Sequence, residues 1–424
     1  MMFDAVGIAP ANLMLPREDV NPTAWACLAC DQYTAQPEYW AEAALEVGNA
    51  PSTLHMMIPE CDLASAAART PAIHQTMRAY LDGGVLREAV RDGFVLVERG
   101  TRSGERVGLV CAVDLEQYDT SPAGNAPVRP TEETIAERLP ARMAIRQGAP
   151  LEMSHILLLM DDVLHSVVEP LHERRRDLRL LYDFPLMKNG GHLRGWAVDS
   201  EADKAAVLAA LTALKTRLPA GAPLLVVGDG NHSLAAAKAY WETCKRSLSK
   251  AQQAAHPARW ALCEIENIHD DALTFAPIHR LLTGVDGAAV MADWTYYCDR
   301  HQMDLSEVTA PGEQEQTMRV VYGGHEAVAA VSHPDGAIAA QTLQHYLDDF
   351  LRRHPEARLD YIHGDEALRA LCQGTDAIGF LMPEMDKERF FDTVRRLHVL
   401  PRKTFSLGGA DEKRFYMECR RLTP

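Results

Sequence analysis

The segment from Pro223 to Lys238 places an apolar strand directly before a polar turn and a helix. The strand ends at Gly228 and delivers its carboxyl end to the turn. The helix that follows presents unpaired backbone N–H groups and the positive end of its dipole at the same point. Such a helix start is a natural binding position for an anion. The segment therefore predicts an α/β architecture with an anion site at the junction between strand and helix.

The turn itself carries a carboxylate, an amide, an imidazole and a hydroxyl group within five residues. Asp229 can take a proton or hold a metal ion, and His232 titrates near neutral pH. Asn231 or Ser233 can cap the helix and can also form a hydrogen bond to a ligand. The simpler interpretation is an ordinary turn with Asn231 as the N-cap. Four polar side chains exceed what capping needs, so we expect a functional site.

Composition and charge narrow the classes of partner. The chain has 424 residues, of which 47% are hydrophobic, and a formal net charge of -16. This acidity argues against broad binding of nucleic acids or anionic membranes, although small anions stay possible. No apolar run approaches the roughly 20 residues that span a bilayer, and Asp4 stands where a signal peptide would carry basic residues. We therefore expect a cytoplasmic protein that binds a small molecule, with its oligomeric state open.

The cysteines and histidines do not predict a metal centre of their own. Nine cysteines are scattered along the chain, which suits reduced thiols better than a disulfide framework. Cys27 and Cys30 form one C-x-x-C pair without a second pair of ligands beside it. The 17 histidines include no H-E-x-x-H motif.

The pattern of predicted elements favours two regions of mixed α/β (α+β) structure. The first contains a β-hairpin at 94–98 and 106–115, a helix at 201–218 and the junction described above. Beyond Ile278 the pattern changes to a helix near 285–294, a hairpin at 318–322 and 327–332, and further strands and helices. We expect an N-terminal α/β domain at 1–275 and a C-terminal α/β region with a basic tail at 276–424.

A second polar segment begins at Arg129. Thr131 can cap a helix whose first turn holds Glu132 and Glu133. If this helix faces the Asp229 turn, Glu133 is our choice of general base for a hydroxyl nucleophile, with Glu132 as the alternative. The helix would continue with a row of arginines that forms either a solvated ion-pair face or a ligand clamp: Arg138, Arg142 and Arg146.

The basic tail offers a third candidate. Arg402 and Lys403 precede a serine and two glycines, and Lys413 and Arg414 follow. Basic side chains with exposed backbone N–H groups suit phosphate recognition, whereas the alternative is a basic surface loop.

Five segments together resemble the family known as domain of unknown function 1015: Cys30–Tyr33, Arg129–Thr134, Gly228–Ser233, Tyr361–Gly364 and Pro401–Ser406. Many members of that family carry an Asp-Gly-His-His-Arg box. This chain retains the second histidine as His232 and has Ser233 in place of the arginine. The box is also similar to the turn of the ParB and sulfiredoxin superfamily, which includes ADP-dependent free serine kinases.

This second resemblance implies a ParB/sulfiredoxin-like nucleotide-binding core with an additional α/β C-terminal region. It implies a nucleotide, ADP or ATP, whose phosphates rest at the helix start on Gly230, Asn231 and Ser233. It also implies Mg²⁺ near Asp229 and a hydroxyl amino acid such as serine as acceptor.

The leading hypothesis is a nucleotide-dependent small-molecule phosphotransferase that acts as a free serine kinase or, in the reverse direction, dephosphorylates phosphoserine. The catalytic residues would be Glu133, Asp229 and His232, and the phosphate charge would be neutralised by Arg129, Arg402 and Lys403. The alternatives are a nucleotide-sensing regulator without turnover and a nucleotide-independent hydrolase or isomerase.

Overall fold

The computed structural model describes residues 3, 5–34, 36–121, 124–133, 139–309 and 315–423. The chain has a mixed α/β fold that divides into two compact units, Met1–Thr274 with Leu407–Pro424, and Phe275–Ser406. The expected assignment of residues 407–424 to the C-terminal region is therefore wrong. Strand β19 (Cys419–Arg421) pairs with β2 (Ala11–Pro16) and β6 (Leu151–Met153), which returns the tail to the first unit.

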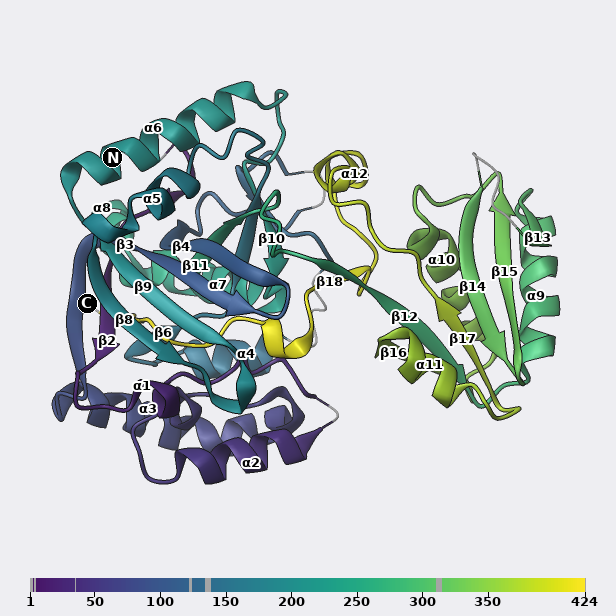
Figure 1. Cartoon of the computed structure of the whole chain (residues 1–424), viewed down its shortest axis with the longest axis horizontal. Helices are drawn as coiled ribbons and strands as arrows, with labels where there is room; N and C mark the ends of the chain where they lie inside the picture. Colours follow the sequence, from purple (N-terminus) through teal and green to yellow (C-terminus); the bar gives the residue numbers. More distant parts are fainter. Residues whose placement is uncertain are drawn as a thin grey trace. The chain divides into compact units, whose positions relative to one another are not determined.

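A twelve-stranded sheet forms the centre of the first unit in the described residues (Figure 1). Its main path runs β5-β10-β7-β11-β4-β3-β2-β19-β6. Strand β10 is parallel to β5, and β7 is parallel to β11, while the other pairs are antiparallel. The remaining bounds are β1 (Ile8–Ala9), β3 (Leu86–Thr101), β4 (Gly104–Asp114), β5 (Val128–Arg129), β7 (Leu157–Met160), β8 (Arg179–Pro185), β9 (His192–Val198), β10 (Leu225–Asp229) and β11 (Trp260–Asn267).

Helices cover both faces of this sheet. On β3, Val95 and Val97 belong to one hydrophobic core, and Phe94 and Leu96 belong to the other, because successive side chains of a strand point to opposite faces. The first core takes residues from α1 (Pro22–Trp25), α2 (Pro37–Val47) and α3 (Ala66–Asp82). The second takes residues from α5 (Glu169–Glu173), α6 (Glu201–Arg217) and α7 (Asn231–Cys244). In Figure 1, α6 lies on one side of the sheet and α2 and α3 lie on the other.

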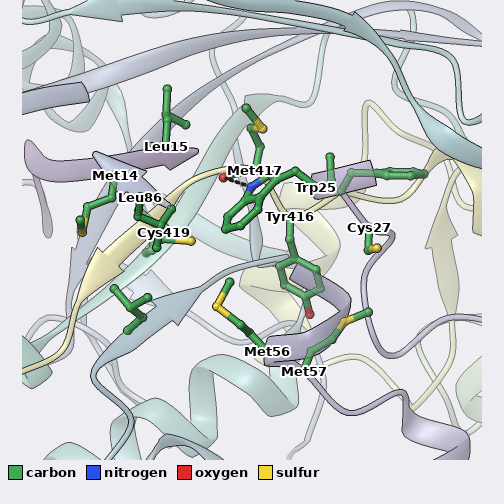
Figure 2. Packing of buried hydrophobic residues seen from close by; sticks show 14 of the residues in the cluster. Met14, Leu15, Trp25, Cys27, Met56, Met57, Leu86, Tyr416, Met417 and Cys419 are labelled. Carbon is green, nitrogen blue, oxygen red and sulfur yellow. Dashed lines mark hydrogen bonds between the residues drawn. The ribbon is translucent and has the colours of Figure 1, made fainter. Parts of the chain in front are cut away.

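The C-terminal tail is buried in the first core. Trp25 is fully buried and donates from Nε1 to the carbonyl oxygen of Met417 at 3.0 Å, as Figure 2 shows. Tyr416 and Met417 are each only 3% exposed. The tail is therefore a structural part of the first unit, and three of its basic residues are buried there: Lys413, Arg414 and Arg420.

The second unit is built on a seven-stranded sheet, ordered β13-β15-β14-β17-β12-β16, with β18 paired to β12. Residues of α9 (Gly287–Arg300) and α10 (Ala339–Arg353) form the core on one face, and residues of α11 (Asp365–Leu371) pack on the other. The other elements are β12 (Phe275–Thr283), β13 (Asp304–Val308), β14 (Gln316–Tyr322), β15 (His325–Ser332), β16 (Arg358–His363), β17 (Ala377–Leu381), α12 (Phe390–Leu397) and β18 (Phe405–Leu407).

Several local expectations are confirmed. The first predicted hairpin is β3 with β4, the helix at 201–218 is α6, and the later hairpin is β14 with β15. The expected helix start at Thr131 is wrong, because no helix includes 131–133, and the next described helix is α4 (Leu139–Arg146). Residues 134–138, with Arg138, lie outside the described residues. Among the described helices, none combines the length and the apolar composition that a membrane crossing requires.

Candidate functional site

The junction between β10 and α7 is a tight turn that requires glycine. Gly230 separates the last strand residue from the first helix residue and has φ +83°. A Cβ atom there would also lie 3.1 Å from the Cα of Ile156. Since L-residues with a side chain rarely adopt this conformation, Gly230 sets the direction in which the helix begins.

The start of α7 has no side-chain cap, which contradicts the interpretation of Asn231 as the N-cap. The N-cap position is Gly230, which has no side chain to accept a hydrogen bond. Asn231 instead donates from Nδ2 to Thr131 Oγ1 at 3.1 Å and accepts from Thr131 N at 3.1 Å. The Thr131 hydroxyl donates to the carbonyl oxygen of Val227 at 2.6 Å. These bonds join the segment after Arg129 to the junction. The first N–H groups of α7 receive no side-chain hydrogen bond from the N-cap residue.

Asp229 is paired with a lysine from the C-terminal tail. Its Oδ1 accepts from Gly230 N at 3.0 Å, and its Oδ2 lies 3.2 Å from Lys413 Nζ. The side chains of Asp229 and Lys413 are 16% and 5% exposed. A nearly buried ammonium group therefore stands directly beside the start of α7.

His155 connects the helix start to the first motif of the chain. Its Nε2 lies 3.2 Å from Ser233 Oγ and 3.5 Å from Asp31 Oδ2, and its Nδ1 lies 2.7 Å from the hydroxyl oxygen of Tyr416. The imidazole is buried, since His155 is only 5% exposed. Side chains from four distant segments thus converge on one corner of the first unit.

Electrostatics favour the charged forms of His155 and Asp31. Burial opposes the imidazolium, but the charge and hydrogen bond of Asp31, with the charge of Asp229, outweigh it and raise the pKa of His155. Burial also opposes the Asp31 carboxylate, but His155, a hydrogen bond from Gln32 and the charge of Lys413 together lower the pKa of Asp31. Burial, aided by the charge of Asp31, raises the pKa of the Cys30 thiol to about 12, so Cys30 is a neutral thiol at physiological pH.

The structure brings together most of the residues expected at the junction. Gly230, Asn231, His232 and Ser233 occupy the N-cap and the first turn of α7, directly after Asp229. Glu133 is exposed. It follows Thr131 by two residues, so its Cα lies within roughly 8 Å of the Thr131 Cα by chain geometry. Its expected role as general base stays a prediction.

Arg129 is engaged with the backbone. It is 5% exposed, donates from Nε to the carbonyl oxygen of Ala126 at 3.1 Å, and also donates to the carbonyl oxygen of Gly221. These bonds engage two of the five N–H donors of the guanidinium group, and the expected contact of Arg129 with a phosphate stays a prediction. Positive charge at the junction comes from Lys413, which pairs with Asp229, and from His155, which contacts Ser233.

Arg402 and Lys403 belong to the second unit. Their carbonyl oxygens each accept from the buried guanidinium of Arg280 at 3.0 Å, which holds the loop backbone, and both side chains are exposed. Their expected contact with a phosphate stays a prediction.

The described residues contain no group of three or more His, Cys, Asp or Glu side chains arranged to hold a metal ion. Asp229 alone could contribute one carboxylate. This would suit Mg²⁺, which is commonly held by one or two carboxylates with substrate phosphates and waters. The arginine row of α4 forms ion pairs, Arg142 with Glu60 at 3.0 Å and Arg146 with Glu152, which favours the ion-pair interpretation of that helix.

Sequence reasoning missed two residues of this corner, Asp31 and His155, whereas Lys413 belongs to the basic tail that was expected to recognise phosphate. Asp31 lies in the motif Cys30–Tyr33 but received no role. His155 lies just before β7 and carries no local signal. Only the pairing of distant strands brings them together.

Comparison of the chain with protein families finds a match over most of its length. The family model described as "Protein of unknown function (DUF1015)" matches residues 8–350. No curated protein matches the chain at a significant level.

Solved structures show a distant similarity of fold. A free serine kinase variant in complex with AMP has 12% identity and a TM-score of 0.41, over 73% of this chain and 90% of that chain. A variant in complex with ADP has 13% identity and a TM-score of 0.40, over 75% and 94%. A conserved hypothetical protein from Pyrococcus furiosus has 12% identity and a TM-score of 0.38, over 74% and 95%. At this level of similarity, none of these structures carries an argument about function.

Proposed function

The chain belongs to the DUF1015 family, and on that premise we propose that it is a nucleotide-dependent phosphotransferase that acts on a small hydroxyl-containing metabolite. The observation that carries this proposal is the start of α7, where N–H groups without a side-chain cap, a helix dipole and the Lys413 ammonium meet. A phosphate group placed there would receive backbone hydrogen bonds and the attraction of the ammonium group together.

Each residue at this corner has a separate role in the proposed reaction. The N–H groups of Asn231 and Ser233 and the Lys413 ammonium would hold phosphate oxygens, and His232 would stabilise the transferring group. Glu133, or alternatively Glu132, would take the proton from the acceptor hydroxyl while its oxygen bonds to phosphorus, and the nucleotide would leave with the bridging oxygen. Asp229 would contribute to holding Mg²⁺ together with the phosphates.

Free serine is the phosphoryl acceptor that the sequence resemblance suggests, and in the reverse direction phosphoserine would be the phosphoryl donor. The structures of free serine kinase variants hold AMP or ADP, and the proposal for the present chain likewise includes a bound nucleotide. Their similarity is too low to support the assignment, which therefore depends on the geometry at α7.

A nucleotide-sensing regulator is the second candidate. The ion pair between Asp229 and Lys413 is the observation that favours it, since an engaged carboxylate is less available to a metal ion. Such a protein would bind a nucleotide at the same corner without turnover.

The test is direct incubation of the purified chain with serine, Mg²⁺ and either ADP, ATP or pyrophosphate, with phosphoserine measured by mass spectrometry. We expect product from the unaltered chain and at least a tenfold loss in Asp229→Asn, because this substitution removes the carboxylate charge. Glu366→Gln is the matched control, since the Glu366 side chain is 92% exposed in the second unit. Nucleotide binding without product with any donor would support the regulator, and no nucleotide binding would contradict both.

A further inference from the structure

A cavity of about 150 Å³ lies beside the start of α7. His155 and Ser233, which meet at the corner described above, are also part of the wall of this cavity. The rest of the wall is mainly apolar and includes Met56, Met57, Met77, Met153, Ala236 and Leu262. The cavity therefore borders the proposed phosphate position, with which it shares Ser233.

The wall is firmly held in the first core. Met56, Met57 and Met77 are each at most 4% exposed, and Figure 2 shows Tyr416 pointing toward Met56 and Met57. Unbranched methionine side chains can adapt to the outline of a bound apolar group. The wall also holds charged side chains, which form the ion pairs Arg142–Glu60 and Arg146–Glu152, and it holds His155 and Ser233, whose side chains contact each other at 3.2 Å.

The size of the cavity limits what can enter it. A dry cavity of roughly 150 Å³ is known to hold benzene, whereas sites for whole drug-sized ligands measure roughly 300–1,000 Å³. A complete nucleotide does not fit, but one ring or one branched hydrocarbon group does. Serine has no such group, so it would react with the cavity unfilled and would bind more weakly than a hydroxyl compound that fills it.

We infer that the small molecule bound at this corner carries an apolar group of benzene size, which occupies the methionine-lined cavity while its phosphate or hydroxyl group lies at the start of α7. This inference rests on the proposed function and specifies its substrate class. The substrate is an alcohol or hydroxyl amino acid with an aromatic or branched apolar part, or its phosphate ester.

Phenyl phosphate is the probe, compared with methyl phosphate and inorganic phosphate by isothermal titration calorimetry. Burial of a ring predicts that phenyl phosphate binds about 10- to 100-fold more tightly than methyl phosphate. Equal affinities for the two esters would overturn the inference.

Two substitutions change the cavity in opposite directions. Ala236→Leu fills it, so we expect the preference for phenyl over methyl phosphate to disappear while inorganic phosphate binds as before. Ala237→Leu is the control, because Ala237 is the next residue of α7 and packs in the second core instead. Met77→Ala enlarges the cavity and should improve binding of 1-naphthyl phosphate relative to phenyl phosphate. If Ala236→Leu does not fold, the result with Met77→Ala decides, and unchanged relative affinities would count against the inference.

A separate measurement with benzene distinguishes this inference from the proposed function. Benzene binding that Ala236→Leu abolishes, without binding of any phosphate, would retain the apolar cavity and contradict the phosphate position. Phosphate binding without any preference for phenyl phosphate would support the phosphate position and contradict the inference about the apolar group.

Discussion

Lys413 Nζ lies 3.2 Å from Asp229 Oδ2, although the two residues belong to segments at the middle and the end of the chain. The contact exists because the tail enters the first core. Tyr416 of the same tail is buried there and contacts His155. It places a positive charge at a helix start that already favours anions. This relationship leads to the first of four predictions.

Replacement of Lys413 by methionine should weaken the binding of inorganic phosphate at least tenfold and lower the free energy of unfolding by about 3 kcal/mol, because it leaves Asp229 without its buried partner. Titration calorimetry and urea denaturation measure the two effects. Lys245→Met is the control, since the Lys245 side chain is 24% exposed and should cost less than about 1 kcal/mol. Unchanged phosphate affinity in Lys413→Met would contradict the role of the ammonium group.

The ion pair between His155 and Asp31 should make stability depend on pH. The raised pKa of His155 contributes stability that is complete below its ordinary value of about 6.5 and is lost as the pH rises through the folded-state pKa. The lowered pKa of Asp31 contributes stability that is present above about 3.9 and is lost as the pH falls through its folded-state pKa.

The difference in stability between the unaltered chain and His155→Gln should therefore be largest between about pH 4 and 6.5 and should decrease at alkaline pH. Urea denaturation at a series of pH values measures this difference. His333→Gln, which alters a side chain that is 78% exposed, should show no comparable maximum. A difference that increases steadily above pH 7 would contradict the protonated state of His155.

Gly230→Ala should lower the free energy of unfolding by about 1–2 kcal/mol from backbone strain, with a further cost from its close approach to Ile156. Gly324→Ala is a matched control, because Gly324 has φ +79° and nothing within 4 Å of its Cβ position. Thermal or urea denaturation of both variants separates strain from contact. Equal losses would mean that Ile156 moves aside without cost.

Thr131→Val should lower the free energy of unfolding by about 1–3 kcal/mol, because it leaves the Val227 carbonyl oxygen and Asn231 Nδ2 without their partner. Thr295→Val removes a hydroxyl bond on an exposed helix surface and should cost far less. A double-mutant cycle with Asn231→Ala measures the coupling, which we expect to be at least 0.5 kcal/mol for residues in direct contact. Additive effects would contradict a shared network.

Local sequence patterns predicted the elements around the candidate site well. The apolar run before Gly228 predicted β10, and the alanine-rich stretch after Ser233 predicted most of α7. The same approach placed a helix at Thr131, because a threonine before two glutamates is typical of a helix start. In the structure, the Thr131 hydroxyl bonds to Val227 instead, and this tertiary contact outweighs the local preference.

The sequence by itself determined the strand, turn and helix at 223–238, because these depend on residues that are neighbours in the chain. Only the tertiary structure decided that Asp31, His155 and Lys413 meet at this turn and that a methionine-lined cavity opens beside it. Such meetings depend on the register of strands far apart in sequence, such as β19 against β2 and β6. The pairing of strands that are far apart in the sequence is set by the packing of a whole core, so no local pattern encodes it.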